Sequence, residues 1–177
     1  MRKLFLLFSL LTAVPAFASA SKPQCIDNVI EAQTPYGTGT MRELLLKVYD
    51  ASLWTDADQW SMNAPFALAV TYDMEIDGDD IADRSIEEMQ HVATIPQAKA
   101  ASYRQQLLKL FPDVVPGDTI TALYDPNKGI VFCFNGKPGG SIRDMEFARE
   151  FMAIWFSPQT SEPKLRKALL ASNFPSP

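Results

Sequence analysis

Residues 111–155 read FPDVVPGDTITALYDPNKGIVFCFNGKPGGSIRDMEFAREFMAIW, and this stretch decides the fold. Its apolar runs predict two strands, Thr119–Tyr124 and Ile130–Asn135, joined by the turn-forming segment Asp125–Gly129. Asn135-Gly136 is a dipeptide typical of a tight turn. Asp144 then suits the start of a helix whose buried face includes Phe147, Phe151, Ile154 and Trp155. The stretch therefore predicts a hairpin, a sharp turn and a capped helix, in that order.

Three more strands are expected upstream of this stretch. The clearest is Phe66–Ile76, where large apolar residues alternate strictly with small or polar ones, which is typical of a half-buried strand. Its apolar face holds Phe66, Leu68, Val70, Tyr72, Met74 and Ile76. The other two are Ile26–Thr34, ended by a turn at Pro35–Gly39, and Leu44–Trp54.

Helical segments complete the pattern. Asp79 or Asp80 can cap a helix that runs to about Met89, and a second helix is expected from Pro96 to Phe111. The inner stripe of the first would be Ile81, Ser85, Glu88, Met89 and Val92. Ser161 opens the last helix, with Pro163 in its first turn. This order of strands and helices predicts one α+β domain, residues 21–177, with an antiparallel sheet covered on one face by helices.

The first 20 residues have the form of a secretory signal peptide. A basic start at Arg2-Lys3 precedes a short apolar run, and the small-x-small rule allows cleavage after Ala18 or Ala20. The run is shorter than the roughly 20 residues that a membrane-spanning helix needs. We therefore expect an exported, periplasmic protein without a membrane span. Cleavage would change the formal net charge from -5 to -7, which gives no electrostatic basis for binding nucleic acid or anionic lipid.

Cys25 and Cys133 are the two cysteines of the chain. An even number of cysteines in an oxidising compartment permits a disulfide. Cys133 lies in one expected strand and Cys25 just before another, so the two could meet if those strands are neighbours. The alternative is a pair of buried free thiols.

No metal or cofactor is predicted. Asp73, Glu75 and Asp77 have the spacing that opens a calcium loop, but Arg84 stands where a bidentate glutamate is required. His91 is the single histidine, and no pair of candidate ligands has the spacing of a zinc finger.

Several pieces of sequence, in a fixed order, resemble one known family. They are Val48–Trp54, Pro65–Leu68, Ser85–Met89, Phe111–Val114, Gly117-Asp118, Asn135-Gly136, Asp144 with Phe147-Ala148, Ile154-Trp155, Thr160–Pro163 and Leu165-Arg166. Together they make the chain similar to the chalcone isomerase-like family, in particular its bacterial exported branch. The resemblance implies an open-faced β-sandwich, in which a strongly curved antiparallel sheet is backed by helices and an apolar cleft lies between them.

The resemblance also implies where catalytic residues would stand, and this chain departs from them. The plant enzymes use an arginine after a Gly-x-Gly turn, a threonine in the next strand and a tyrosine before the first helix. Here Arg42 follows Gly37-Thr-Gly39 one residue later than in the enzymes, and Tyr49 occupies the threonine position. The tyrosine position falls near Asp80-Ile81, where the chain has no tyrosine.

These departures favour a non-catalytic protein that binds a small apolar ligand, lipid-like or aromatic, in the cleft. Arg42, Tyr49 and Tyr72 are the candidate polar groups facing it, and Trp54, Trp60 and Trp155 could supply aromatic lining. Two alternatives remain. One is an isomerase or lyase acting on an unknown substrate, and the other is an envelope protein that works through protein contact.

Overall fold

The computed structural model describes residues 20–171, so the predicted signal peptide lies, apart from Ala20, outside the described residues. In chain order the elements are η1 (Gln24–Ile26), β1 (Gly37–Glu43), β2 (Leu46–Trp54), β3 (Phe66–Tyr72), α1 (Gly78–Val92), α2 (Gln97–Leu107), β4 (Thr119–Asp125), β5 (Gly129–Phe134), β6 (Lys137–Ile142), α3 (Met145–Phe156) and α4 (Pro163–Leu170). Within the described residues, no helix is both long and apolar enough to cross a membrane.

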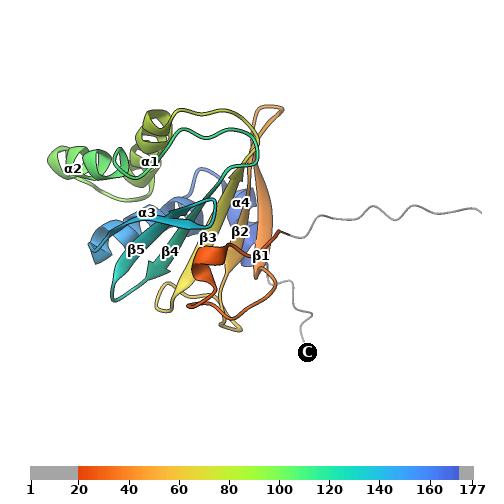
Figure 1. Ribbon diagram of the computed structural model, residues 1–177. Helices are drawn as coiled ribbons and strands as arrows, with labels where there is room; N and C mark the ends of the chain where they lie inside the picture. The colour runs from red at the N-terminus through yellow and green to blue at the C-terminus, as the bar shows by residue number, and fades with distance from the viewer. Residues whose placement is uncertain (1–19, 172–177) are drawn as a thin grey trace, which may run out of the picture.

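The strands form one six-stranded antiparallel sheet whose spatial order follows the chain order from β1 to β6. Only the connection from β3 to β4 is long, and it carries α1 and α2 (Figure 1). Ile76 and Val114 exchange backbone hydrogen bonds of 3.1 and 3.0 Å, which pairs the outgoing and returning ends of this connection. The predicted α+β fold with an antiparallel sheet is therefore confirmed.

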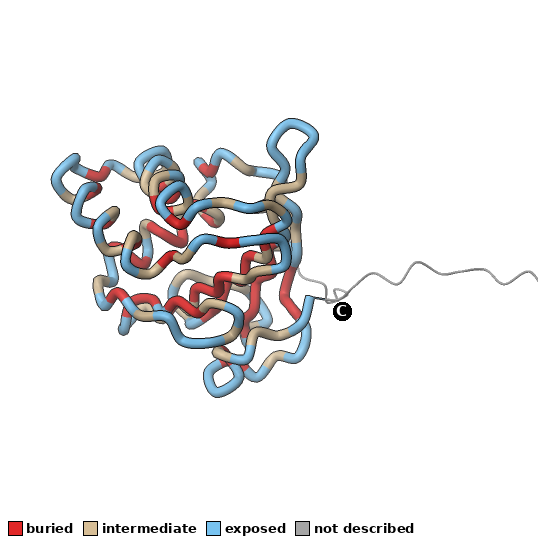
Figure 2. Tube along the Cα trace, turned by 45° about the horizontal axis from the view of Figure 1, so that its top comes forward, coloured by how far each residue is buried: buried red, intermediate tan, exposed pale blue. Residues whose placement is uncertain are grey.

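Helices cover one face of the sheet and bury the main core there. α4 lies against β1 and β2, α3 lies against β5, and α1 packs on α3 (Figure 1). The apolar face of β3 points into this layer, as its alternation predicts. The buried segments run through the middle of the sheet and along the inner sides of the helices (Figure 2).

The opposite face of the sheet is covered by the N-terminal segment. Ile26 and Ile30 pack there against Trp54, Ala67 and Ala69, so β3 is buried on both faces rather than on one. The prediction of a strand at Ile26–Thr34 is wrong, because this segment forms a single 3₁₀ turn followed by an irregular stretch. The structure joins Cys25 to Cys133 of β5 in a disulfide on this outer face, with the Cα atoms 6.6 Å apart.

β1 begins at Gly37, inside the segment Pro35–Gly39 that was expected to be a turn. The reason is the close approach of α4 to the edge of the sheet. A Cβ atom at Gly37 would collide with the carbonyl oxygen of Leu169, and one at Gly39 would collide with Leu165. Glycine thus serves here to let a helix approach a strand, not to bend the chain.

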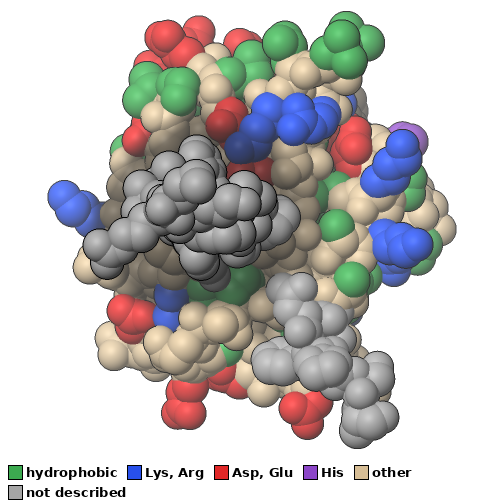
Figure 3. All heavy atoms as spheres, turned by 90° about the vertical axis from the view of Figure 1, so that its right-hand side faces the viewer, with side chains coloured by type: hydrophobic (Ala, Val, Ile, Leu, Met, Phe, Trp, Pro, Cys, Tyr) green, Lys and Arg blue, Asp and Glu red, His purple; other side chains and the backbone are tan. Residues whose placement is uncertain are grey.

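The tip of the β1–β2 hairpin is made of leucine. The expected strand Leu44–Trp54 begins two residues late, because Leu44 and Leu45 form the turn, with Leu44 at φ 55°. Their side chains are 95% and 92% exposed, and Leu46 is exposed beside them. Figure 3 views the molecule from the right-hand side of Figure 1, where β1 lies. At the upper end of this view, where the β1–β2 hairpin ends, hydrophobic and acidic side chains are both exposed.

At the opposite edge of the sheet, between β5 and β6, Asn135 and Gly136 have φ values of 48° and 76° and form the predicted tight turn. The turn leads into β6, a strand that the sequence did not predict. Asp144 caps α3 as expected, since its carboxylate accepts hydrogen bonds from the backbone N–H groups of Glu146 and Phe147.

The starts of α1 and α4 differ from the predictions. Asp79 and Asp80 lie within the first turn of α1 and do not cap it. The backbone N–H of Gly78 instead donates to the carboxylate of Asp113, at 2.8 Å, from the returning end of the long connection. α4 begins at Pro163 rather than at Ser161.

Candidate functional site

A cavity of about 670 Å³ lies between one end of the sheet and the helical layer. Strands β1, β2 and β3 supply its sheet side, α1 and the segment after β3 supply another wall, and the end of α3 with the α3–α4 loop closes it. The lining residues are Met41, Glu43, Val48, Tyr49, Tyr72, Met74, Glu75, Ile76, Asp77, Asp80, Ile81, Arg84, Ser85, Glu88, Ile154, Trp155, Thr160, Ser161 and Glu162.

An irregularity in the β1–β2 pairing shapes the sheet side of the cavity. Met41 pairs with Tyr49, but the next residue, Arg42, pairs with Lys47, so Val48 has no partner across the ladder. In a regular strand, neighbouring side chains point to opposite faces. This β-bulge lets Val48 and Tyr49 line the same cavity although they are adjacent in sequence.

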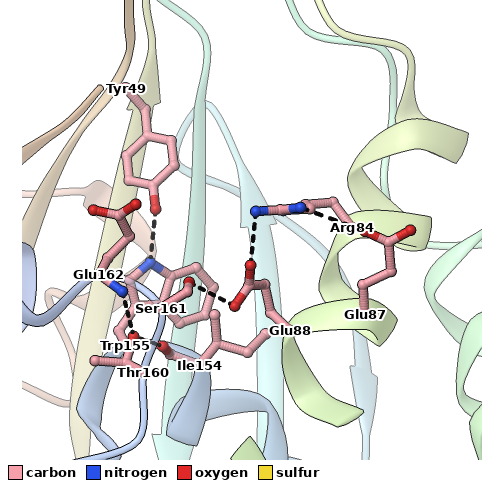
Figure 4. Close-up of polar contacts among 9 residues, drawn as sticks. All are labelled: Tyr49, Arg84, Glu87, Glu88, Ile154, Trp155, Thr160, Ser161 and Glu162. Carbon is pink, nitrogen blue, oxygen red and sulfur yellow. Dashed lines mark hydrogen bonds and ion pairs between the residues drawn. The ribbon is translucent and has the colours of Figure 1, made fainter. Parts of the chain in front are cut away.

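Tyr49 is held by a hydrogen bond across the cavity wall. The indole Nε1 of Trp155 donates to the hydroxyl oxygen of Tyr49 at 3.1 Å, and Figure 4 shows the two side chains pointing toward one another from β2 and α3. Burial raises the pKa of Tyr49 to about 12, and the carboxylates of Glu162 and Glu88 add to this rise. Tyr49 is therefore a neutral phenol at physiological pH.

Tyr72, on the neighbouring strand, packs its ring edge-to-face on that of Tyr49, with centroids 6.1 Å apart. The residue is only 8% exposed. Its hydroxyl makes no hydrogen bond to any residue between 20 and 171, and burial raises its pKa above the ordinary value. The cavity is therefore lined by a tyrosine hydroxyl that has no hydrogen-bond partner among residues 20–171.

Glu88 and Arg84 of α1 form an ion pair on the opposite wall. Arg84 Nη2 lies 2.8 Å from one carboxylate oxygen of Glu88, and the hydroxyl of Ser161 donates to the other at 2.7 Å (Figure 4). These contacts link α1 to the α3–α4 loop. Thr160 fixes the same loop, since its hydroxyl donates to the carbonyl of Ile154 and accepts from the N–H of Glu162.

Of the three predicted site residues, the structure brings two together. Tyr49 and Tyr72 both line the cavity. Arg42 does not, and its prediction as a cleft-facing group is corrected: it is exposed, while its neighbours Met41 and Glu43 line the cavity. Alternation along β1 turns Arg42, which stands between these two lining residues, to the outer face of the sheet, away from Tyr49.

Other residues of the site were found only in part from the sequence. Trp155 lines the cavity, whereas Trp54 is buried under the N-terminal segment and Trp60 packs on Phe156. The expected inner stripe of the first helix contributes Ile81, Ser85 and Glu88. Glu162 was not anticipated as a site residue. Its only signal was its place in the Thr160–Pro163 piece of the family pattern.

Comparisons with known proteins agree with this architecture. An uncharacterized protein of Haemophilus influenzae is 26% identical over 124 residues, which cover 70% of this chain. The match spans 60% of the length of that curated relative. The structure superimposes on that of a fatty-acid binding protein of Arabidopsis thaliana with a TM-score of 0.62 and 13% identity, covering 78% of this chain and 86% of the other. At that identity the likeness concerns the fold alone.

The sequence comparison extends over most of the chain. Residues 34–171 match the sequence profile of the chalcone isomerase-like family. This range includes all six strands, all four α-helices and every residue that lines the cavity. The chain therefore belongs to the chalcone isomerase-like family.

Proposed function

We propose that this protein is an exported, periplasmic, non-catalytic member of the family that binds a small apolar ligand in the cavity between sheet and helices. One observation carries the proposal: the cavity of about 670 Å³ has a largely apolar and aromatic lining. Ligand sites in proteins are commonly hollows of about 300–1,000 Å³ with such a lining and a few polar groups. The apolar lining comprises Met41, Val48, Tyr49, Tyr72, Met74, Ile76, Ile81, Ile154 and Trp155.

The polar groups in the cavity do not form the family's catalytic arrangement. Arg42 lies on the other face of the sheet, and Asp80 and Ile81 line the cavity at the position where the resemblance places the enzymes' tyrosine. Tyr49 and Tyr72 have raised pKa values, so neither provides a phenolate base near neutral pH. This favours binding over an isomerase or lyase reaction.

Export is supported by the signal-like first 20 residues and by the disulfide, which is stable in an oxidising compartment. The alternative of protein contact through exposed aromatic residues has less support. Every aromatic residue between 20 and 171 is buried or half-buried.

The test of ligand binding is to fill the cavity and measure the loss of binding. Ser85 is buried on α1 and lines the cavity, so Ser85→Phe would place a ring in the ligand's space. Gln90→Phe, at an exposed position of the same helix, is the matched control. An apolar fluorescent dye should bind the wild type and Gln90→Phe equally, and Ser85→Phe about tenfold or more weakly, since a displaced ring-sized contact is worth more than 1.4 kcal/mol.

Mass spectrometry of the protein isolated gently from the periplasm should in addition find a co-purifying small molecule. Circular dichroism must show that Ser85→Phe is folded. An empty wild-type protein that binds no apolar dye would refute the proposal, as would a folded Ser85→Phe variant that binds the dye as tightly as the wild type.

A further inference from the structure

The polar part of the cavity lining has a strong excess of negative charge. Six lining residues are acidic, namely Glu43, Glu75, Asp77, Asp80, Glu88 and Glu162, and one, Arg84, is basic. Four of the acids lie exposed at the rim, whereas Glu88 and Glu162 are partly buried. A ligand that enters therefore passes a negatively charged rim and meets further carboxylates inside.

Arg84 does not offset this excess for a ligand. Its guanidinium is 2.8 Å from Glu88 and 3.5 Å from Glu87, and its side chain is 62% exposed. The cation is thus already paired with carboxylates of its own helix. A carboxylate ligand would have to compete with both of them for the one positive charge of the lining.

Glu162 is the acid best placed to meet a ligand. Its carboxylate makes no ion pair or hydrogen bond with any residue of the described range 20–171. Figure 4 shows it beside the hydroxyl end of Tyr49, with the ion-paired Glu88 across from it. The carboxylates of Glu162 and Glu88 both contribute to the raised pKa of Tyr49, as expected where the local potential is negative.

A second, independent feature also points to a ligand at this place. Tyr72 is more than nine-tenths buried, lines the cavity and leaves its hydroxyl without a partner among the described residues. Because this hydroxyl is on a cavity-lining residue and no described residue bonds to it, it is available to a polar group of a ligand or to water in the cavity. Together with Tyr49 and Trp155, Tyr72 provides three aromatic rings around the same space.

We propose that this cavity selects amphiphiles with an apolar body and a positively charged, ammonium-type head over those with a carboxylate head. The inference rests on the proposed ligand-binding function and names the class of ligand. Free carboxylates at Glu162 and the rim attract a cation, aromatic rings stabilise an alkylammonium through their π-electrons, and the same acids repel a carboxylate. The protein would differ in this from a fatty-acid carrier, although the folds are alike.

The test compares three probes with the same twelve-carbon chain, used below their micelle concentrations. Dodecyltrimethylammonium, dodecanol and dodecanoate each compete with the apolar dye for the wild-type protein. We expect dodecyltrimethylammonium to bind about tenfold or more tightly than dodecanoate at low salt, with dodecanol between them, and the difference to shrink as salt is added.

Two variants, each lacking one negative charge, test whether the preference for a cationic head arises inside the cavity. Glu162→Gln should weaken dodecyltrimethylammonium about three- to tenfold while leaving dodecanol unchanged, since one nearby charge is removed without loss of volume. Glu31→Gln removes the same charge from an exposed position outside the cavity and should change neither affinity appreciably. Ser85→Phe fills the cavity, so any dodecyltrimethylammonium that still binds to this variant is attached to the acidic surface and not to the cavity.

The outcomes separate this inference from the function on which it rests. If dodecanol binds and dodecanoate binds as tightly as dodecyltrimethylammonium, the ligand class is wrong and the binding function stands. Equal losses in Glu162→Gln and Glu31→Gln, or full cation binding by Ser85→Phe, would also overturn the inference, because the charge effect would not arise in the cavity. If none of the three probes binds, the proposed function itself fails.

Discussion

At the scale of single residues, the environment of the two cavity tyrosines determines what they can do. Tyr49 and Tyr72 lie on adjacent strands, and burial raises the pKa of both phenols. A phenol that keeps its proton near neutral pH can donate a hydrogen bond, but it offers no phenolate to act as a base. These residues therefore suit the orientation of a bound polar group rather than the removal of a proton.

This environment predicts how stability depends on alkaline pH. The pKa of Tyr49 rises from an ordinary 10.0 to about 12, so between these values the unfolded chain has lost the proton and the folded protein keeps it. Stability is then fully present below pH 10 and falls as the pH rises toward 12. Urea unfolding from pH 8 to 12 should show this fall, and it should be smaller in Tyr49→Phe. An equal fall in both proteins would contradict the assignment.

The residues of the site were predictable to different degrees. Tyr49 and Tyr72 follow from strand alternation and the family pattern, because each depends on its own segment. The prediction for Arg42 follows the family pattern and not its own strand: Met41 and Glu43 line the cavity, so alternation along β1 turns Arg42 to the outer face. Glu162 reaches the cavity only through the hydrogen bonds that fix its loop to α3, and this information is tertiary.

At the scale of elements, the β1–β2 turn shows a leucine in a conformation that leucine disfavours. Leu44 has φ 55°, and a left-handed backbone costs a residue with a Cβ atom about 1–2 kcal/mol. Its side chain is almost fully exposed, so packing offsets little of that cost. The Leu44→Gly variant should therefore be more stable than the wild type, by about 0.5–1 kcal/mol after the entropy cost of glycine in the unfolded chain.

The neighbouring leucine is the matched control. Leu45 is just as exposed but does not have a positive φ. Leu45→Gly should leave stability unchanged or lower it slightly, because no backbone strain is relieved. Urea denaturation of both variants measures the difference. A Leu44→Gly variant that is no more stable than Leu45→Gly would show that the turn conformation is not strained.

The elements that sequence could not predict are those formed by contacts with distant segments. β3 carries its own alternating pattern and was recognised, although its outer face is also buried. β1 was taken for a turn because the reason for Gly37 and Gly39 lies in α4, more than 120 residues later. β6 contains Lys137-Pro-Gly-Gly140, which has low strand propensity, and it is extended because it pairs with β5.

At the scale of the whole molecule, the two faces of the sheet have different roles. The helical face holds the large core and the cavity, and the short N-terminal segment packs on the outer face. That segment buries Ile26 and Ile30 against the sheet, and its backbone N–H groups at Glu31 and Ala32 donate to the carboxylate of Asp56. The disulfide between Cys25 and Cys133 adds a covalent link to these contacts.

Reduction of this disulfide should destabilise the protein without emptying the cavity. The bond links residues 108 positions apart, and loss of such a link typically costs about 2–4 kcal/mol, because the unfolded chain gains freedom. Release of the segment would also expose Trp54, so the fluorescence of the native protein should shift to longer wavelength on reduction.

Urea unfolding with and without dithiothreitol measures the loss of stability, and Cys25→Ala/Cys133→Ala, which cannot respond to the reductant, is the control. Dye affinity should stay within about twofold of the wild type after reduction, a difference of less than 0.5 kcal/mol, because the cavity lies on the opposite face. Unchanged stability on reduction would show that the N-terminal segment holds to the sheet by its apolar contacts alone. A large loss of dye binding would instead show that the outer cover and the ligand cavity are coupled through the sheet.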